Sequence, residues 1–227
     1  MKNNDIYSYP NEDILINKFD CHNKEMLAKL EAIASGYAIL NLQLHPIHGK
    51  FDFNHLKKIH HAIFKDIYEW AGHPRTVDIG KGNLFCRAQF IDSYASSVFE
   101  NFYSDCNSVK KSKTDFIQIL AKHYSDMNAL HPFREGNGRS QREFTRELCF
   151  KCGYMLDLSR TNRDEMLNAS ITSFNSSDLT GFISIFEKCI VSLGDYKDIQ
   201  KELTSKFLTL SKDDIDSDLL KNFPSVD

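Results

Sequence analysis

The sequence lacks the features that mark several specialised classes of protein. No apolar run approaches the roughly 20 residues that a membrane-spanning helix needs, and residues 1–5 carry no signal-peptide core. The formal net charge is only -3, which argues weakly against a general nucleic-acid binder. With 227 residues, 41% of them hydrophobic, the chain is expected to bury one sizeable core. We therefore expect neither a membrane segment nor direct nucleic-acid binding.

The sequence also lacks a complete pattern for a built-in metal site. Cys149-x-x-Cys152 has no second ligand pair, and His60-His61 has no companion cluster. The acidic stretch at 213–218 lacks the glycine and the closing glutamate of a calcium loop. We expect the six cysteines to be reduced, and the two histidines to be surface or packed side chains.

The residues that carry chemistry gather in one stretch, 131–142, which reads HPFREGNGRSQR. Apolar residues at three- and four-residue steps predict a helix over 114–130. Pro132 disfavours the helical conformation at His131, so that helix should end near residue 130. A second apolar pattern predicts a new helix that opens near Arg139 and stops at Gly153. The stretch is therefore expected to be a loop between two helices.

This loop has the composition of a phosphate-binding site. A helix N-terminus offers unpaired N–H groups and a partial positive charge. Gly136 and Gly138 let the backbone approach an anion closely. Arg139 and Arg142 lie one helical turn apart, which suits forked contacts to two successive phosphate groups.

Two further residues of the same loop suggest a reaction. Glu135 offers a hard oxygen ligand, which suits Mg²⁺ held jointly by protein and phosphates. His131 carries an imidazole whose unperturbed pKa, near 6.5, suits a general base. A base, a metal ligand and a phosphate cradle therefore fall within a dozen residues.

These residues resemble the complete signature of the Fic family, HPFx(D/E)GNGRxxR, which the chain matches without a gap from His131 to Arg142. Similarity extends from Tyr9-Pro10 through residues 67–72 to about Leu193. The resemblance implies an all-α fold, a Fic-type helical bundle with one short β-hairpin flap near the active site. It is strongest to compact bacterial Fic toxins and to the Fic domains of secreted effectors.

The resemblance also implies an activity, protein adenylylation, in which AMP passes from ATP, with Mg²⁺, to a Tyr, Ser or Thr hydroxyl of a target protein and pyrophosphate leaves. His131 would act as the catalytic base and Glu135 would hold the metal. By the same resemblance, the α-phosphate would be bound by Gly136, Asn137 and Gly138. The middle phosphate would be bound by Arg139 and Ser140, and the terminal phosphate by Arg142.

A break in helical spacing at 75–87 predicts a β-hairpin with a glycine-rich tip. From the residues alone a plain surface turn is the simpler interpretation. The Fic resemblance implies a flap that pairs with a segment of the target by strand addition and covers the nucleotide. The corresponding flap residues are Gly80, Lys81, Gly82, Asn83 and Leu84.

We divide the chain into an N-terminal arm (1–20), a Fic core (21–194) and a C-terminal helix with an acidic tail (195–227). Within the core, apolar spacing predicts further helices. The first carries Met26, Leu27, Leu30, Ile33, Tyr37, Leu40 and Leu44 on one face. The predicted ranges are 25–44, from 52 or 54 to about 70, 90–102, 163–174, from 177 or 178 to 193, and 196–210.

Two other classes of function remain open: transfer of phosphate or of another phosphate-linked group, and nucleotide binding without catalysis. The related Doc branch has Lys where this chain has Gly138, binds the nucleotide reversed and transfers phosphate, so Gly138 favours AMP transfer. The second alternative is a non-catalytic module that only binds nucleotide. An intact motif argues against it.

Partners follow only from the resemblance. The family's inhibitory pattern (S/T)xxxE(G/N) occurs once, at Ser96 to Asn101, away from either terminal position that the family uses. We therefore expect a separate small antitoxin to supply the inhibitory glutamate. The first expected target is the ATPase subunit of a type II topoisomerase, with eukaryotic GTPases as the alternative for a secreted effector. The expected location is the bacterial cytoplasm, with translocation into a host cell as the alternative.

Overall fold

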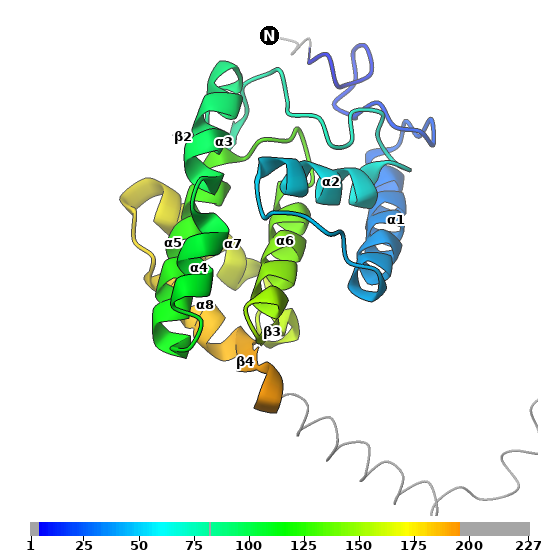
Figure 1. Ribbon diagram of the computed structural model, residues 1–227. Coiled ribbons are helices and arrows are strands. Elements are labelled where there is room, and N and C mark those ends of the chain that lie inside the picture. Colours follow the sequence, from blue (N-terminus) through cyan, green and yellow to red (C-terminus); the bar gives the residue numbers. More distant parts are fainter. Residues whose placement is uncertain (1–4, 82, 196–227) are drawn as a thin grey trace, which may run out of the picture.

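The computed structural model describes residues 5–81 and 83–195, and within them the chain is mainly helical (Figure 1). The α-helices are α1 (Lys24–Leu44), α2 (Phe53–Phe64), α3 (Ile91–Phe99), α4 (Phe102–Ser108), α5 (Lys113–Leu130), α6 (Asn137–Lys151), α7 (Arg163–Ser176) and α8 (Thr180–Cys189). Two short 3₁₀ helices, η1 (Ala88–Phe90) and η2 (Leu158–Arg160), precede α3 and α7. The expected helical bundle is confirmed.

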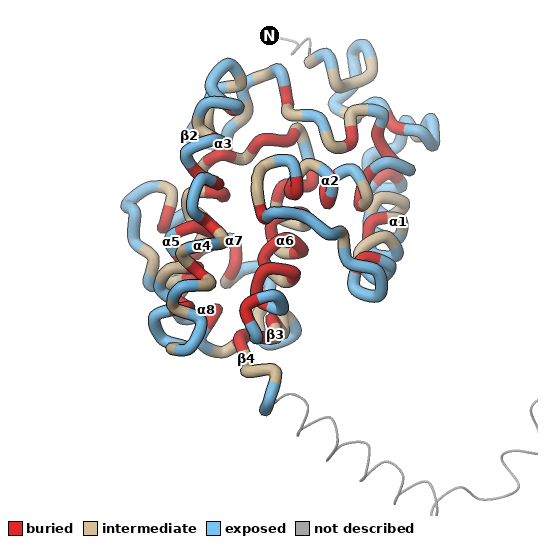
Figure 2. The backbone as a smooth tube through the Cα atoms, viewed as in Figure 1, coloured by how far each residue is buried: buried red, intermediate tan, exposed pale blue. Residues whose placement is uncertain are grey.

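Helix α5 lies at the centre of the bundle, where α3, α4, α6, α7 and α8 all pack on it. Ser112 begins the helix by accepting the N–H of Asp115. Its buried residues form one broad face, as the three- and four-residue spacing predicted: Phe116, Ile117, Leu120, Ala121, Tyr124, Met127 and Leu130. Figure 2 shows the buried segments of α5 and α6 inside the exposed turns of the outer helices.

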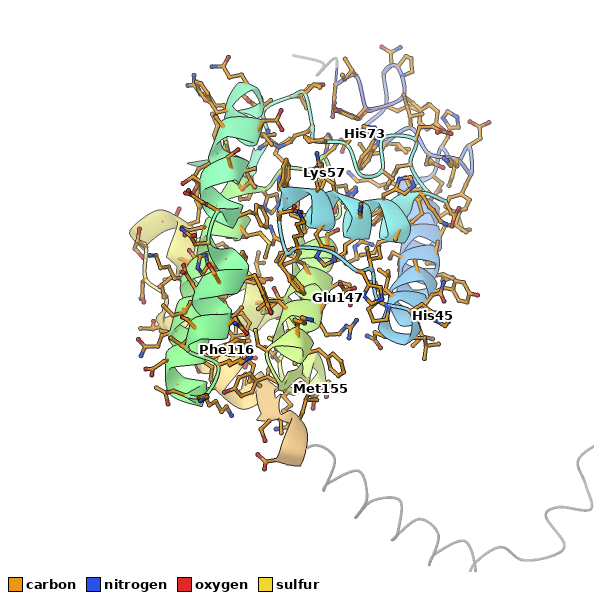
Figure 3. The ribbon with its side chains drawn as sticks, in the orientation of Figure 1. His45, Lys57, His73, Phe116, Glu147 and Met155 are labelled. Carbon is orange, nitrogen blue, oxygen red and sulfur yellow. The ribbon has the colours of Figure 1, made fainter. Side chains whose placement is uncertain are left out.

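Helix α6 is polar in sequence yet largely buried, because its side chains find partners. Glu143 bonds Arg146 at 2.6 and 2.9 Å. Glu147 points from α6 toward the loop after α1, where it lies 3.1 Å from His55 Nε2 and accepts the N–H of Ile47 at 3.3 Å (Figure 3). Satisfied partners remove most of the cost of burying charge. They also fix α6, whose N-terminus is the predicted phosphate cradle.

The predicted hairpin is present as β1 (Gly80–Lys81) antiparallel to β2 (Asn83–Leu84), with Gly80 opposite Leu84. A second pair was not predicted: β3 (Tyr154–Leu156) runs antiparallel to β4 (Ile190–Ser192). It ends the predicted final core helix early, at Cys189, because the backbone of 190–192 turns to pair with β3.

Two other predicted helices were wrong in extent. The region 90–102 is divided into α3 and α4, and the break at Glu100–Asn101 carries no proline or glycine to announce it. Helix α2 begins as predicted, with Asp52 accepting the N–H of His55 at 2.8 Å, but it ends at Phe64 rather than near residue 70. Residues 65–72 continue as turns, and Gly72 adopts a φ of 84°.

The apolar face predicted for α1 is turned mainly to solvent. Its buried residues are Leu27, Ser35 and Leu42, whereas the exposed ones include Met26, Ile33, Tyr37, Leu40 and Leu44. None of the helices in the described ranges has both the length and the apolar character that crossing a membrane requires.

The N-terminal arm is irregular, as predicted, but it is packed against the core. Ser8 forms an isolated bridge with Leu15, and Asp5 accepts from Arg134 at 2.8 Å and 2.5 Å. The predicted helix at 196–210 and the acidic tail lie outside the described residues. The proposed division into three parts stays a prediction.

Candidate active site

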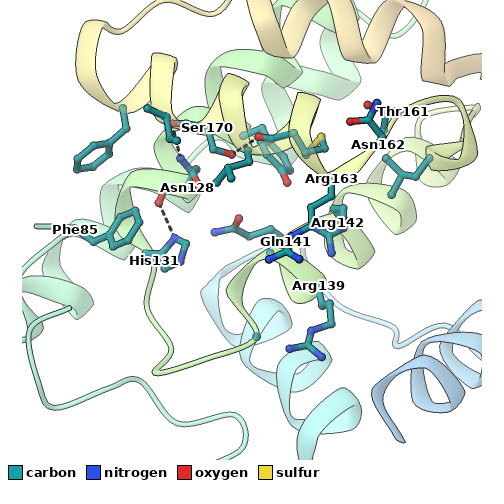
Figure 4. A pocket seen from close by; sticks show the side chains of 18 of the residues that line it. Phe85, Asn128, His131, Arg139, Gln141, Arg142, Thr161, Asn162, Arg163 and Ser170 are labelled. Atoms are coloured by element: carbon teal, nitrogen blue, oxygen red, sulfur yellow. Dashed lines mark hydrogen bonds between the residues drawn. The ribbon is translucent and has the colours of Figure 1, made fainter. Parts of the chain in front are cut away.

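A cavity of about 970 Å³ opens between the 131–142 stretch and helix α7 (Figure 4). Its polar wall comes from the motif: His131, Glu135, Gly136, Gly138, Arg139, Gln141 and Arg142. The opposite wall comes mainly from α7 and the turn before it: Leu158, Thr161, Asn162, Arg163, Met166, Leu167, Ser170, Ile171, Phe174 and Asn175. Phe85, next to the flap, Tyr124 and Asn128 complete the lining.

His131 ends α5 in a left-handed conformation, with φ 43° and ψ 61°. Its Nδ1–H donates to the carbonyl oxygen of Asn128 at 3.1 Å, so Nε2 carries the lone pair that accepts a proton. The ring of Phe85 stacks on the imidazole, with centroids 3.8 Å apart and planes 8° from parallel. Phe85 and the bond to Asn128 together fix the plane of the predicted base (Figure 4).

The loop after His131 is supported by His60, a buried residue of α2. His60 Nδ1 accepts the N–H of Gly72 at 2.8 Å, which leaves Nε2–H to donate to the carbonyl of Glu135 at 3.0 Å. Its ring stacks on the buried Phe133 with centroids 3.7 Å apart. Burial lowers the pKa of His60 to about 3. His60 is therefore a packed side chain, one of the two outcomes that we expected from the sequence. It also supports the loop that carries the motif, through its bond to Glu135.

Gly136 makes the loop fit against α2. Its φ is 82°, and a Cβ there would lie 2.3 Å from the ring of Phe64. Helix α6 then begins at Asn137, so the N–H groups of its first turn have no partner within the helix. Because Gly136 and Gly138 line the cavity, the predicted anion cradle faces open space.

Two predicted nucleotide contacts, Asn137 and Ser140, have side chains turned away from the cavity, so a contact through their backbone is what stays a prediction. The side chain of Asn137 is buried, and it both accepts the N–H of Phe133 at 2.8 Å and donates to its carbonyl at 2.7 Å. The hydroxyl of Ser140, fully buried, donates to the carbonyl of Gly136 at 3.1 Å. Neither residue lines the cavity. These side chains shape the loop, so a side-chain contact from either to a nucleotide is not supported.

Glu135 lies at the cavity edge with its side chain 48% exposed. One carboxylate oxygen accepts the N–H of Gly136 at 2.9 Å, which orients the group. No set of three or more His, Cys, Asp or Glu side chains capable of holding a metal occurs in residues 5–81 and 83–195. A single oriented carboxylate fits a Mg²⁺ ion that takes its remaining ligands from phosphates and water.

The two motif arginines have different surroundings. Arg139 donates to Glu31 at 2.5 Å and to Ser35 at 2.9 Å, and its guanidinium lies 4.7 Å from the centre of the Phe64 ring. Arg142, by contrast, forms no ion pair within the described ranges although it lines the cavity. Arg139 is thus anchored to α1, and Arg142 is available for an anion.

A third arginine joins the site from outside the motif. Arg163 opens α7, is exposed, and lines the same cavity as Arg142, with no ion pair to any described residue (Figure 4). The apolar wall of α7 was also missed: Leu167 and Ile171 are 43% and 49% exposed, which is unusual for large apolar side chains. Sequence spacing predicted α7 but gave no sign of which face meets the motif.

The flap lies at the same end of the cavity as His131. Phe85 follows β2 directly and lines the cavity, while Leu84 is 56% exposed. Gly82 falls outside the described residues, and the backbones of Gly80, Lys81 and Asn83 form the two short strands. The structure therefore brings the hairpin to the site, and its docking role stays a prediction.

Comparison with known proteins agrees with this site. The family model described as "Fic/DOC family" matches residues 50–149. The "Probable protein adenylyltransferase Fic" of Escherichia coli is 30% identical over 192 residues, which cover 84% of this chain and 94% of that protein. The chain belongs to the Fic/DOC family.

Other Fic proteins resemble the chain in sequence or in structure. "Protein adenylyltransferase VbhT" of Bartonella schoenbuchensis is 38% identical over 178 residues, 78% of this chain but only 37% of that protein. The crystal structure of the N-terminal Fic domain of a Bartonella quintana effector, described with bound ADP, superposes with a TM-score of 0.77 at 27% identity. That match covers 82% of this chain and 95% of the other.

Proposed function

We propose that this Fic chain is a protein adenylyltransferase, which transfers AMP from ATP to a hydroxyl side chain of a target protein. The observation that carries the proposal is one cavity that is lined by His131, by the N-terminus of α6 and by Arg142. A target hydroxyl held near His131 Nε2 can lose its proton to that nitrogen while its oxygen attacks a phosphate bound at the N-terminus of α6. The names of the E. coli and B. schoenbuchensis relatives support the same activity.

The reaction forms a bond between the target oxygen and the α-phosphorus. The bond from that phosphorus to its bridging oxygen breaks, and pyrophosphate leaves. His131 Nε2 takes the hydroxyl proton, while the N–H groups of the first turn of α6 stabilise the charge on the α-phosphate. Arg142 and Arg163 bind the phosphates that leave. The apolar side of α7 receives the nucleobase and keeps water from it.

Glu135 is the residue proposed to hold Mg²⁺. The ion, when bound, would neutralise charge on the phosphates. The chain itself contributes the oriented carboxylate and the close approach of backbone at Gly136.

The target segment is proposed to pair with the flap strands, so that its hydroxyl reaches His131. Backbone pairing fixes a side chain without reading the sequence around it. The flap therefore leaves the identity of the target open, and the ATPase subunit of a type II topoisomerase stays the first candidate. The chain is proposed to act in the bacterial cytoplasm, with delivery into a host cell as the alternative.

Inhibition is proposed to come from a separate small antitoxin. Glu31 pairs with the first motif arginine, Arg139, and no described glutamate pairs with the second, Arg142. The exposed apolar face of α1 gives a separate protein a surface to bind. The purified chain is then expected to be active alone, and activity only after mutation of an internal glutamate would contradict this.

Labelled ATP distinguishes the candidate activities. The chain is incubated with a bacterial lysate and ATP labelled at the α- or the γ-phosphate. Adenylylation labels a protein only from the α position, and phosphate transfer only from the γ position. No label from either position, together with measurable ATP binding, indicates a non-catalytic module and refutes the proposal.

A further inference from the structure

Arg75 is a buried cation with no carboxylate partner. It is 2% exposed and is the largest of the fully buried side chains. No Asp or Glu in residues 5–81 and 83–195 forms an ion pair with it. Burial lowers the pKa of the guanidinium, although an arginine remains protonated at neutral pH. Burying a charge in this way is costly and calls for specific compensation.

The compensation comes from three backbone carbonyls in three different segments. Nε donates to the carbonyl of His131 at 3.0 Å, at the C-terminus of α5. Nη1 donates to Val77 at 2.8 Å, before β1, and Nη2 donates to Cys86, after β2. The planar, forked guanidinium is the only side chain able to span such a set. The side chain of Arg75 therefore joins His131 to the two segments next to the hairpin, Val77 before β1 and Cys86 after β2, which we call the flap stems.

Backbone bonds on either side reinforce the same junction. The N–H of Arg75 donates to the carbonyl of Pro132 at 2.8 Å, and the N–H of Cys86 donates to the carbonyl of Ala129 at 3.1 Å. The two flap stems thus flank the end of α5 from residue 129 to residue 132. Phe85, immediately before Cys86, is the residue whose ring covers the imidazole.

His131 requires such support, because its backbone is left-handed, with φ 43°, a conformation that is unfavourable for a residue other than glycine. The hydrogen bond from Arg75 to the His131 carbonyl holds that conformation in place, and so does the stacking of Phe85 on the imidazole ring. Arg75 itself does not line the cavity, so it has no direct route to the nucleotide.

We propose that Arg75 is a positioning residue that couples the flap to the catalytic base, fixing His131 for proton transfer through its carbonyl and through Phe85. This inference rests on the proposed adenylyltransferase function. A target strand that adds to the flap then meets a base already aligned, because the stems and His131 share one guanidinium.

The test uses Arg75→Lys, which keeps the charge but replaces the fork by a single ammonium. At saturating ATP, kcat for AMP transfer into a lysate is expected to fall about 10- to 100-fold, the scale of a small misplacement of a catalytic group. The dissociation constant for ATP is expected to stay unchanged. Arg87→Lys is the matched control, because Arg87 is exposed at the same end of the flap, and it should retain wild-type kcat.

Full activity in Arg75→Lys overturns the inference, as does an equal loss of kcat and ATP binding, which would indicate general damage. Nitrogen-15 NMR of the His131 ring gives a readout that needs no activity: the Nδ1–H tautomer should dominate in the wild type and become mixed in Arg75→Lys. If the variant does not fold, the wild-type Arg75 Nε–H still tests the contact, since slow exchange supports it and ordinary exchange refutes it. A wild-type chain that transfers no AMP refutes the proposed function alone.

Discussion

The guanidinium of Arg139 lies 2.5 Å from the carboxylate of Glu31, and this bond joins the start of α6 to the middle of α1. The carboxylate also accepts from the hydroxyl of Tyr68, whose pKa is raised by burial and by this bond. Ser35, the face of Phe64 and the carboxylate of Glu135, 3.6 Å from the guanidinium, complete the surroundings of Arg139. The first arginine of the motif is therefore a structural anchor in this chain, whatever it contributes to nucleotide binding.

Arg139→Ala is accordingly expected to lower the stability of the fold. It removes a hydrogen-bonded ion pair whose side chains are only 22% and 15% exposed, which typically costs about 2 kcal/mol. For a chain of this size that corresponds to a fall in Tm of about 4–8 °C, measurable by calorimetry. Arg142→Ala serves as the control: it breaks no described ion pair and should leave Tm unchanged while weakening ATP binding. Equal Tm shifts in both variants would contradict the distinction.

The neutral state of His60 predicts a pH dependence of stability. Its pKa is lowered to about 3 in the folded chain, against about 6.5 when unfolded. The unfolded state then binds the extra proton between these values, so stability is complete above pH 6.5 and is lost as the pH falls below it. Each unit of pH below 6.5 lowers the free energy of unfolding by up to about 1.4 kcal/mol through this one group.

The measurement is an NMR titration of the histidine rings between pH 4 and 8. The ring of His60 should remain neutral to the acid end of this range. The free energy of unfolding, measured by urea denaturation at each pH, should fall with decreasing pH in the wild type and by the same amount in His45→Gln. A His60 ring that titrates near pH 6.5 would contradict the assignment.

His131→Ala is expected to lower AMP transfer by about 10²–10⁴-fold, the usual contribution of a positioned general base. ATP should still bind, because the proposed phosphate contacts come from the N-terminus of α6, Arg142 and Arg163 and not from His131. Initial rates with α-labelled ATP and a binding isotherm for ATP make the comparison. Unchanged turnover would remove His131 from the role of base.

The sequence predicted the parts of this site that depend on neighbouring residues. The end of α5 at Leu130 follows from local spacing and Pro132, and the start of α6, predicted near Arg139, is found two residues earlier at Asn137. The Fic motif supplied the identities of His131 and Glu135. Such features need no knowledge of what packs against them.

The rest depends on contacts between distant segments. The bond from His60 to Glu135 spans 75 residues, and the one from Arg75 to His131 spans 56. The pairing of β3 with β4 and the choice of the exposed face on α1 are tertiary effects of the same kind. The direction of the Asn137 side chain, which bonds Phe133, is a further example, because a motif gives residue types but not side-chain directions.

Gly138 is expected to determine which phosphate group the chain can transfer. A Cβ at this position would lie 3.0 Å from Nη1 of Arg142, so Gly138→Lys places an ammonium beside a guanidinium on the cavity wall. We expect AMP transfer to fall at least about tenfold, equivalent to about 1.4 kcal/mol of transition-state stabilisation. Gly138→Ala, which adds no charge, is the control and should lose less. Equal losses would assign the effect to size rather than charge.

Arg163 is expected to bind the phosphates that depart as pyrophosphate. It lines the same cavity as Arg142, and neither guanidinium has a carboxylate partner in the described part of the chain. Arg163→Ala should therefore raise the KM for ATP about tenfold or more, the equivalent of one charge-assisted hydrogen bond. The affinity for AMP should not change, because AMP lacks the groups that Arg163 contacts.

Arg160→Ala provides the matched control for that experiment. Arg160 lies three residues earlier, bonds Asp157 at 2.9 Å and does not line the cavity. Its loss should leave both nucleotide affinities unchanged. If Arg163→Ala weakened AMP and ATP equally, Arg163 would be a contact for the nucleoside or the α-phosphate, and Arg142 would bind the departing phosphates without it.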